Sequence, residues 1–134
     1  MNFKLLIIVS IVLTTTFTAC KKTPGQGGNA SIKGKVWVKQ YDPFFTVIMR
    51  EYYDPNRSVY ITYGNNISPD QTVQTNSNGE FEITYMRKGT YTITLYSKVF
   101  ADSLHPSGSV AVDTTISITE RKQVIDLGTI KVQK

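Results

Sequence analysis

The sequence predicts an all-β protein built as a single antiparallel sandwich, and three observations support this fold class. Apolar and polar residues alternate through most of residues 30–134, which is the period-2 pattern of strands with one buried face. Short turn-forming sequences separate these runs. No segment outside residues 40–57 shows a helical period with caps. We therefore expect seven strands, or eight or nine if residues 40–57 contribute strands of their own.

The alternation also predicts which side chains form the core. In each expected strand, apolar residues occupy every second position. Turns are expected at Asn78-Gly79 and at Arg87-Lys88-Gly89, where glycine can adopt a positive φ. The expected core residues in chain order are Ile32, Val36 and Val38, with Gly34 in the same phase; Val59, Ile61 and Tyr63; Val73; Phe81, Ile83 and Tyr85; Tyr91, Ile93 and Leu95; and Ile116 and Ile118.

The last expected strand contains a break in phase. Ile125 and Leu127 share one phase, but Ile130 and Val132 are out of step with them by one residue. Gly128 lies between the two pairs, and a β-bulge there would restore the phase. We therefore expect all four apolar side chains on the core side of the sheet.

Residues 1–20 have the layout of a secretory signal. Lys4 lies in a basic start, residues 5–13 are an apolar stretch, and small residues precede Cys20. The apolar stretch is too short to cross a bilayer, which takes about 20 residues. Cys20 is the only cysteine, so it has no disulfide partner within the chain. A free thiol and an intermolecular disulfide are the alternatives to a modified cysteine.

The stretch Phe17-Thr18-Ala19-Cys20 resembles the lipobox of bacterial lipoproteins. The resemblance implies that residues 1–19 are a signal peptide that is removed, and that Cys20 becomes lipidated. Because Lys21 rather than Asp follows the cysteine, it also implies delivery to the outer membrane. We therefore expect a lipid anchor in the outer membrane, with the protein facing either the surface or the periplasm, and a flexible tether over residues 20–29.

The charge and length of the remaining chain limit its partners and its organisation. The formal net charge is +5 for the whole sequence and +4 without residues 1–19, which remove one lysine and leave 14 basic and 10 acidic residues, but the basic residues are scattered singly or in pairs. Scattered charge in an exported protein argues against a nucleic-acid partner. Residues 30–134 amount to one domain, which is long enough to bury a core without disulfides.

Four stretches resemble the carboxypeptidase regulatory-like domain, namely IKGKVWV, RSVYITYG, TNSNGEFEI and RKGTYTITLYS. That family has a Gly-x-Val opening strand, a Thr-Asp-x-x-Gly-x-Phe turn and a Gly-x-Tyr-x-Ile strand, and here Asn76 replaces the usual Asp. The resemblance covers about residues 31–132 and implies an Ig/transthyretin-like sandwich. Because its motifs concern turns and core faces, it implies a fold and no activity.

The residues that carry enzyme chemistry are scarce. His105 is the only histidine and Cys20 the only cysteine, so no catalytic triad or zinc site can be assembled. Glu80 and Glu82 lie on one side of a strand, where a solvated face is the simpler interpretation. Asn65, Asn66 and Asp70 offer a single carboxylate, too little for a calcium loop. We expect no enzymatic activity, no metal and no cofactor.

Two short patterns, Asp102-Ser103-Leu104 and Asp113-Thr114-Thr115, match the pattern of some bacterial periplasmic O-glycosylation systems. Three-residue patterns arise often by chance, so modification of Ser103 or Thr114 is a minor hypothesis that the intact mass of the native protein would test.

Residues 40–57 are longer than the connection usual in the resembling family and are rich in aromatic residues. One interpretation is an aromatic platform that contacts a glycan or a peptide. The other is an extra hairpin that packs onto the sandwich around Trp37, because adjacent aromatic residues are usually buried. The candidate binding residues are Tyr41, Phe44, Phe45, Tyr52 and Tyr53.

Strand direction predicts which turns lie together. If every strand reverses direction, the connections near residues 64–71, 87–89 and 120–122 lie at the N-terminal end, and residues 40–57 lie at the other end. This arrangement inverts if residues 40–57 add a single strand. Basic residues gain free energy near anionic head groups. The expected membrane-proximal basic residues are Lys21, Lys22, Arg87, Lys88, Arg121 and Lys122.

These observations favour a non-enzymatic envelope lipoprotein that presents a membrane-distal aromatic loop to a glycan or a protein. The alternative is a structural or accessory subunit of an outer-membrane complex, docked through a strand edge or through residues 40–57. The sequence chooses neither the ligand nor the oligomeric state.

Overall fold

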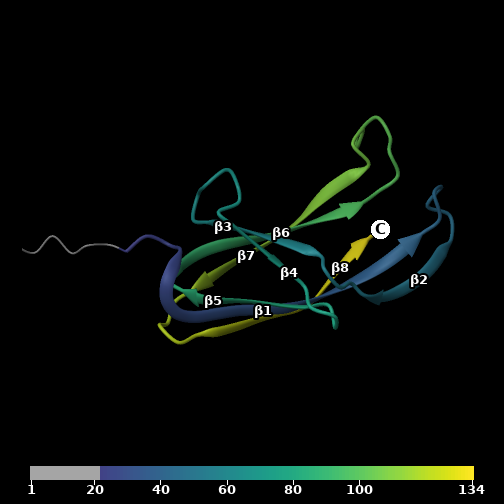
Figure 1. Ribbon diagram of the computed structural model, residues 1–134. Helices are drawn as coiled ribbons and strands as arrows, with labels where there is room; N and C mark the ends of the chain where they lie inside the picture. The colour runs from purple at the N-terminus through teal and green to yellow at the C-terminus, as the bar shows by residue number, and fades with distance from the viewer. Residues whose placement is uncertain (1–21) are drawn as a thin grey trace, which may run out of the picture.

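The computed structural model describes residues 22–134, so the expected signal peptide, Cys20 and Lys21 lie outside the described residues. Within this range the chain forms eight strands and no helix, which confirms the all-β prediction. Figure 1 shows how the strands are arranged. Accordingly, residues 22–134 contain no helix that could span a membrane. The strands are β1 (Gln26–Tyr41), β2 (Ile48–Tyr53), β3 (Ser58–Tyr63), β4 (Gln71–Gln74), β5 (Glu80–Met86), β6 (Gly89–Lys98), β7 (Ser109–Ile118) and β8 (Val124–Gln133).

The first sheet is built around the long strand β1. Its first part pairs antiparallel with β5, and its last residues pair antiparallel with β2 on the same edge. On the opposite edge, β8 runs parallel to β1 from Ser31 to Lys39. The expected wholly antiparallel arrangement is therefore wrong for this pair. The physical reason is that β8 crosses over from the other sheet, so its neighbour is not the strand before it in sequence.

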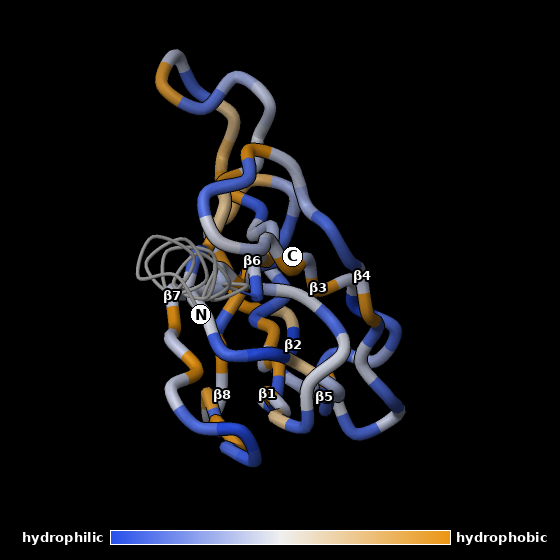
Figure 2. The backbone as a smooth tube through the Cα atoms, turned by 90° about the vertical axis from the view of Figure 1, so that its left-hand side faces the viewer, coloured by the Kyte–Doolittle hydropathy of each residue, from blue (hydrophilic) through white to orange (hydrophobic). Residues whose placement is uncertain are grey.

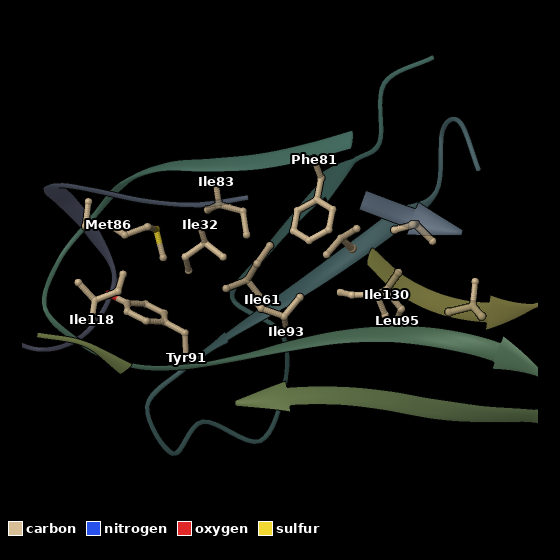
Figure 3. Close-up of a cluster of buried hydrophobic side chains, with 14 of the residues drawn as sticks. Ile32, Ile61, Phe81, Ile83, Met86, Tyr91, Ile93, Leu95, Ile118 and Ile130 are labelled. Atoms are coloured by element: carbon tan, nitrogen blue, oxygen red, sulfur yellow. The ribbon is translucent and has the colours of Figure 1, made fainter. Parts of the chain in front are cut away.

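The second sheet has the order β4-β3-β6-β7, and all of its pairs are antiparallel. The two sheets pack face to face, and the side chains between them form one apolar core, shown in Figure 3. The expected core faces are confirmed in β1, β3 and β6. The buried core residues are Ala30, Ile32, Val36, Val38, Val59, Ile61, Phe81, Ile83, Met86, Tyr91, Ile93, Leu95, Ile118, Ile130 and Val132.

Strand β5 departs from the expected alternation at its end. Tyr85 was expected on the core face, but it is 69% exposed and has a φ of 61°. Met86 takes the buried position instead and is 0% exposed. A residue in the left-handed region shifts the phase of the strand by one, and the pairing of β1 with β5 is irregular at the same point.

The bulge expected at Gly128 is confirmed. Gly128 has a φ of 66°, and the register of β1 with β8 shifts at this point, between Lys33 and Lys35. Ile130 and Val132 are buried, and Ile125 and Leu127 pack against the core from partly buried positions.

The folded domain begins before the expected boundary at residue 30. Strand β1 starts at Gln26, so residues 26–29, expected to be tether, belong to the first sheet. Gly25 is buried, its N–H donates to the Tyr91 hydroxyl at 2.8 Å, and the Arg87 N–H donates to its carbonyl at 2.8 Å. The Gly-rich segment therefore packs onto the start of β6.

The two ends of the sandwich follow from the strand directions, and Figure 1 shows them at left and right. Gly89, at the start of β6, lies against Pro24, and Gln133, near the end of β8, donates its N–H to Ser97 near the end of β6. Strand β6 thus runs the same way as β1, so β3 runs the same way as β2. Residues 40–57 do add a single strand, yet the expected arrangement of the ends does not invert, because β2 and β3 share a direction.

Candidate functional site

Residues 40–53 form a hairpin arm at the end opposite to the N-terminal segment, where β1 extends beyond β5 and pairs with β2 (Figure 1). Its turn is held by Asp42, whose carboxylate accepts hydrogen bonds from the N–H groups of Thr46 at 2.6 Å and Val47 at 2.9 Å. The Phe45 N–H donates to the Asp42 carbonyl at 3.0 Å, and Phe45 has a φ of 57°. The hydrogen bonds to the carboxylate, led by that from the Val47 N–H and followed by that from the Thr46 hydroxyl, lower the pKa of Asp42. The turn is therefore ordered by its own contacts.

The five candidate aromatic residues do not form one platform. Tyr41 and Phe45 stack with their ring centroids 5.5 Å apart and their planes at 19°. Tyr52 packs against the core, and Tyr53 meets Trp37 edge to face at 4.8 Å. Phe44 is 73% exposed. The β2 tyrosines contact the sandwich, as the packing interpretation expects, and the turn carries the exposed ring of Phe44. Whether any of these rings contacts a ligand stays a prediction.

Exposed apolar side chains gather at the end of this arm. Besides Phe44, Val47 is 58% exposed and Met49 is 66% exposed. Ile48 is also exposed, and we call Phe44, Val47, Ile48 and Met49 the arm tip. Sequence reasoning missed the three aliphatic members because it counted only aromatic rings. The signal that could have found them is the run Val47-Ile48-Met49 beside a turn, with no polar residue between them.

The outer face of the first sheet carries ion pairs. Lys35 Nζ lies 2.8 Å from Glu80 Oε1, and this contact lowers the pKa of Glu80 and raises that of Lys35. Lys33 pairs with Asp126 at 3.7 Å. Glu80 and Glu82 line a hollow of about 340 Å³ together with these partners. The strand alternation places both carboxylates on the solvated face, since Phe81 and Ile83 between and beside them are buried.

Four of the six basic residues singled out in the sequence surround one hollow of about 540 Å³ at the N-terminal end. Lys22 belongs to the N-terminal segment, Arg87 and Lys88 to the β5–β6 turn, and Arg121 to the β7–β8 turn. Gly27, Gly28, Asn29 and Met86 complete the lining, and we call this hollow the basic pocket. Figure 2 looks toward this end and shows the β7–β8 turn in the blue of hydrophilic residues. Lys122 follows Arg121 in that turn, and the position of these residues relative to a membrane stays a prediction.

The other residues considered in the sequence have local roles. His105 lies in the β6–β7 loop, where Asp102 accepts hydrogen bonds from the N–H groups of Leu104 at 2.9 Å and His105 at 2.7 Å. Asp70 accepts hydrogen bonds from Tyr63 and Asn66 and so closes its own loop. Among residues 22–134, no group of three or more His, Cys, Asp and Glu side chains could hold a metal ion.

The two glycosylation candidates differ in exposure. Ser103 is exposed in the β6–β7 loop. Thr114 is only partly exposed and lies within β7, opposite the buried Ile93. An enzyme would therefore reach Ser103 more readily than Thr114.

Comparisons with known proteins concern the sandwich. The family model of domain II of polysaccharide lyase family 4 matches residues 71–124, which is less than half of the chain and excludes the hairpin arm. No curated protein matches the chain.

Two solved structures resemble the fold at low identity. A putative carbohydrate binding protein from Pseudomonas aeruginosa is 11% identical, with a TM-score of 0.44 over 82% of this chain and 91% of that one. A 9R-lipoxygenase from Cyanothece is 16% identical, with a TM-score of 0.39 over 96% of this chain. This chain spans only 20% of the length of that lipoxygenase.

Proposed function

We propose that this protein is a non-enzymatic, lipid-anchored binding module of the bacterial outer membrane, and that the tip of its hairpin arm contacts the ligand. The observation that carries the proposal is the arm tip itself. Phe44, 73% exposed, and Val47, 58% exposed, lie on the turn that Asp42 holds in shape, and Met49, 66% exposed, follows at the start of β2. A soluble domain gains nothing from ordering such a patch unless something covers it.

A glycan is the first ligand class. The stacked pair of Tyr41 and Phe45 beside the exposed Phe44 offers ring faces on which a sugar can stack. The family model matched by residues 71–124 is named for a polysaccharide lyase, which makes a saccharide the first class to screen.

A protein partner is the second class, and it corresponds to an accessory role in an envelope complex. Val47, Ile48 and Met49 are aliphatic and exposed, and such side chains are more typical of a protein interface than of a sugar site. The two classes separate experimentally, because only a glycan will bind the purified protein on a glycan array.

The binding test compares two double variants. Phe44→Ala with Met49→Ala removes the exposed ring and thioether of the arm tip. Phe100→Ala with Leu104→Ala is the matched control, since these residues are 56% and 81% exposed in the β6–β7 loop. We expect the first pair to lose glycan binding, or photocrosslinks to a partner in cells, while the control keeps them. If both double variants keep or lose binding to the same extent, the binding surface does not lie at the arm tip.

The anchor is tested separately. Metabolic labelling with an alkyne fatty acid is expected to label the wild-type protein but not Cys20→Ser, and the variant is expected to leave the membrane fraction. Protease treatment of intact and permeabilised cells then gives the orientation. Cleavage on intact cells favours extracellular glycans, whereas protection until permeabilisation favours the accessory role in the periplasm. An unlabelled wild-type protein would refute the lipid anchor.

A further inference from the structure

The basic pocket gathers positive charge from three separate segments of the chain. Lys22, the neighbours Arg87 and Lys88, and Arg121 all line it, and none of the Asp and Glu residues within residues 22–134 does. Residues far apart in sequence meet there because the β5–β6 and β7–β8 turns lie at the same end as the N-terminal segment. Four cationic side chains thus face a single hollow of about 540 Å³.

These cations have no carboxylate partners. Among residues 22–134, none of Lys22, Arg87, Lys88 and Arg121 forms an ion pair. The lysines of β1 differ, because Lys33, Lys35 and Lys39 each pair with an acidic residue. Like charges that face one hollow repel one another, and an anion in the hollow would offset that repulsion.

The backbone around the pocket is fixed before any ligand arrives. A Cβ atom at Gly27 would lie 2.7 Å from Arg87 Nη2, and one at Gly28 would overlap the Met86 carbonyl. Glycine therefore lets the N-terminal segment lie directly against Arg87. The Arg87 N–H donates to the Gly25 carbonyl. The Arg87 carbonyl accepts a hydrogen bond from the Tyr91 hydroxyl at 2.8 Å. The side-chain Nε of Arg87 is buried and has no hydrogen-bond partner among residues 22–134.

We propose that the basic pocket binds phosphate groups. Arginine presents a planar fork of donors that suits phosphate oxygens, and lysine adds point charge. Four cations without acidic neighbours match a ligand with two or more negative charges. The phosphate comes either from the head group of an anionic lipid or from a soluble phosphate ester. The lipid source rests on the proposed function, because an anchor at Cys20 would hold Lys22 within about 7 Å of the acylated residue.

The test uses the full chain purified in a neutral detergent and titrated with inorganic pyrophosphate by calorimetry. The pocket variant is Lys88→Gln with Arg121→Gln, both exposed residues. The matched control is Lys98→Gln with Lys131→Gln, which removes the same charge from exposed positions near the other end. The pocket variant is expected to weaken binding by more than about tenfold, because charge-assisted hydrogen bonds are lost, and the control by less than about twofold. Melting temperatures check that all variants fold.

A second titration identifies the source of the phosphate. Micelles doped with phosphatidylglycerol are compared with micelles doped with phosphatidylcholine. Displacement of pyrophosphate by phosphatidylglycerol alone supports the pocket as a lipid head-group site. Pyrophosphate binding without such displacement supports a soluble phosphate ester.

Two results would overturn the proposal: an equal loss of affinity in both double variants, or no binding of either phosphate probe by the wild type. Neither result changes what is expected for fatty-acid labelling of Cys20 or for binding by the arm-tip variants. A negative result for phosphate binding is therefore distinguishable from a negative result for the proposed function.

Discussion

Hydrogen bonds and an ion pair of individual side chains stabilise the connection between β2 in the first sheet and β3 in the second. The hydroxyl of Thr75 accepts a hydrogen bond from the Arg57 N–H at 2.8 Å and donates to the Asp54 carbonyl. Thr75 is 2% exposed, so water cannot replace these contacts. Asp54, 3% exposed, pairs with Arg57 Nε at 2.8 Å. A turn that the sequence marks only as Thr-Asn-x-x-Gly-x-Phe thus fixes the chain after the hairpin arm.

Replacing Thr75 with valine is therefore expected to destabilise the protein by about 2 kcal/mol or more. The change keeps the shape but leaves the partly buried Arg57 N–H and the buried Asp54 carbonyl without their partners. Urea unfolding measures the effect. Thr90→Val is the control, because Thr90 is exposed and its side chain has only a 3.3 Å contact with Ser117. A similar loss in both variants would show that the Thr75 hydroxyl has no special role.

Two glycines with positive φ provide a second comparison. A Cβ atom at Gly79 would lie 2.8 Å from the Tyr53 Cβ and 3.0 Å from the Asp54 nitrogen. One at Gly128 would meet nothing within 4 Å. Alanine at either site incurs about 1–2 kcal/mol for the left-handed backbone, and Gly79→Ala adds a clash of about 1–3 kcal/mol. We expect thermal denaturation to show a clearly larger loss for Gly79→Ala, and equal losses would contradict the packing around Gly79.

At the scale of the element, the hairpin arm divides its residues between packing and exposure. Its base is attached to the sandwich through Tyr52 on the core side and through the contact of Tyr53 with Trp37 on the outer side. Its tip has no such contacts and holds its shape through Asp42. Strand β2 thus packs onto the sandwich through its tyrosines and exposes apolar side chains at its start.

This division predicts different outcomes for two aromatic substitutions. Tyr52→Ala is expected to lower the free energy of unfolding by about 2 kcal/mol or more, because it removes a ring packed against the core. Phe44→Ala is expected to change it by less than about 0.5 kcal/mol, since the ring is 73% exposed. Chemical denaturation of both variants tests the pair. A large loss for Phe44→Ala would mean that the tip is packed and is not a free binding surface.

At the scale of the whole molecule, the carboxylates that stabilise the fold are distributed over its surface. Glu80 has a lowered pKa because Lys35 donates a hydrogen bond to it, and Asp102 has a lowered pKa because the His105 N–H donates to it. Asp42 behaves in the same way at the arm turn, where the Val47 N–H is the main donor. These groups hold protons less tightly in the folded state than in the unfolded state.

Stability is therefore expected to fall in acid. Because the unfolded chain binds more protons, the contribution of these carboxylates is fully present above their ordinary pKa of about 4 and is lost as the pH falls through their lower folded values. We expect a nearly constant melting temperature from about pH 7 to 5 and a decline below about pH 4. Glu80→Gln should reduce the decline more than Glu82→Gln, since Glu82 has no ion pair among residues 22–134. Equal declines in the two variants would contradict the role of the Lys35 pair.

Part of this protein can be derived from local sequence pattern. Alternation of apolar residues placed Ile32, Val36 and Val38 in the core, and one glycine between two out-of-phase pairs predicted the bulge at Gly128. The same pattern could not show that Tyr85 turns outward or that β1 begins at Gln26. Both depend on contacts with distant residues, the second of them on the hydrogen bonds of Gly25 with Tyr91 and Arg87.

The sequence by itself determined the all-β class, the core faces and the aromatic enrichment of residues 40–57, because these are properties of neighbours along the chain. Strand direction also predicted that the basic turns share the N-terminal end. Only the tertiary structure decided that β8 runs parallel to β1, that the aromatic residues divide between base and tip of the arm, and that the basic residues line one hollow. The physical reason is that strand pairing joins residues far apart in sequence. Their proximity depends on how the sheets pack as a whole, which no local period encodes.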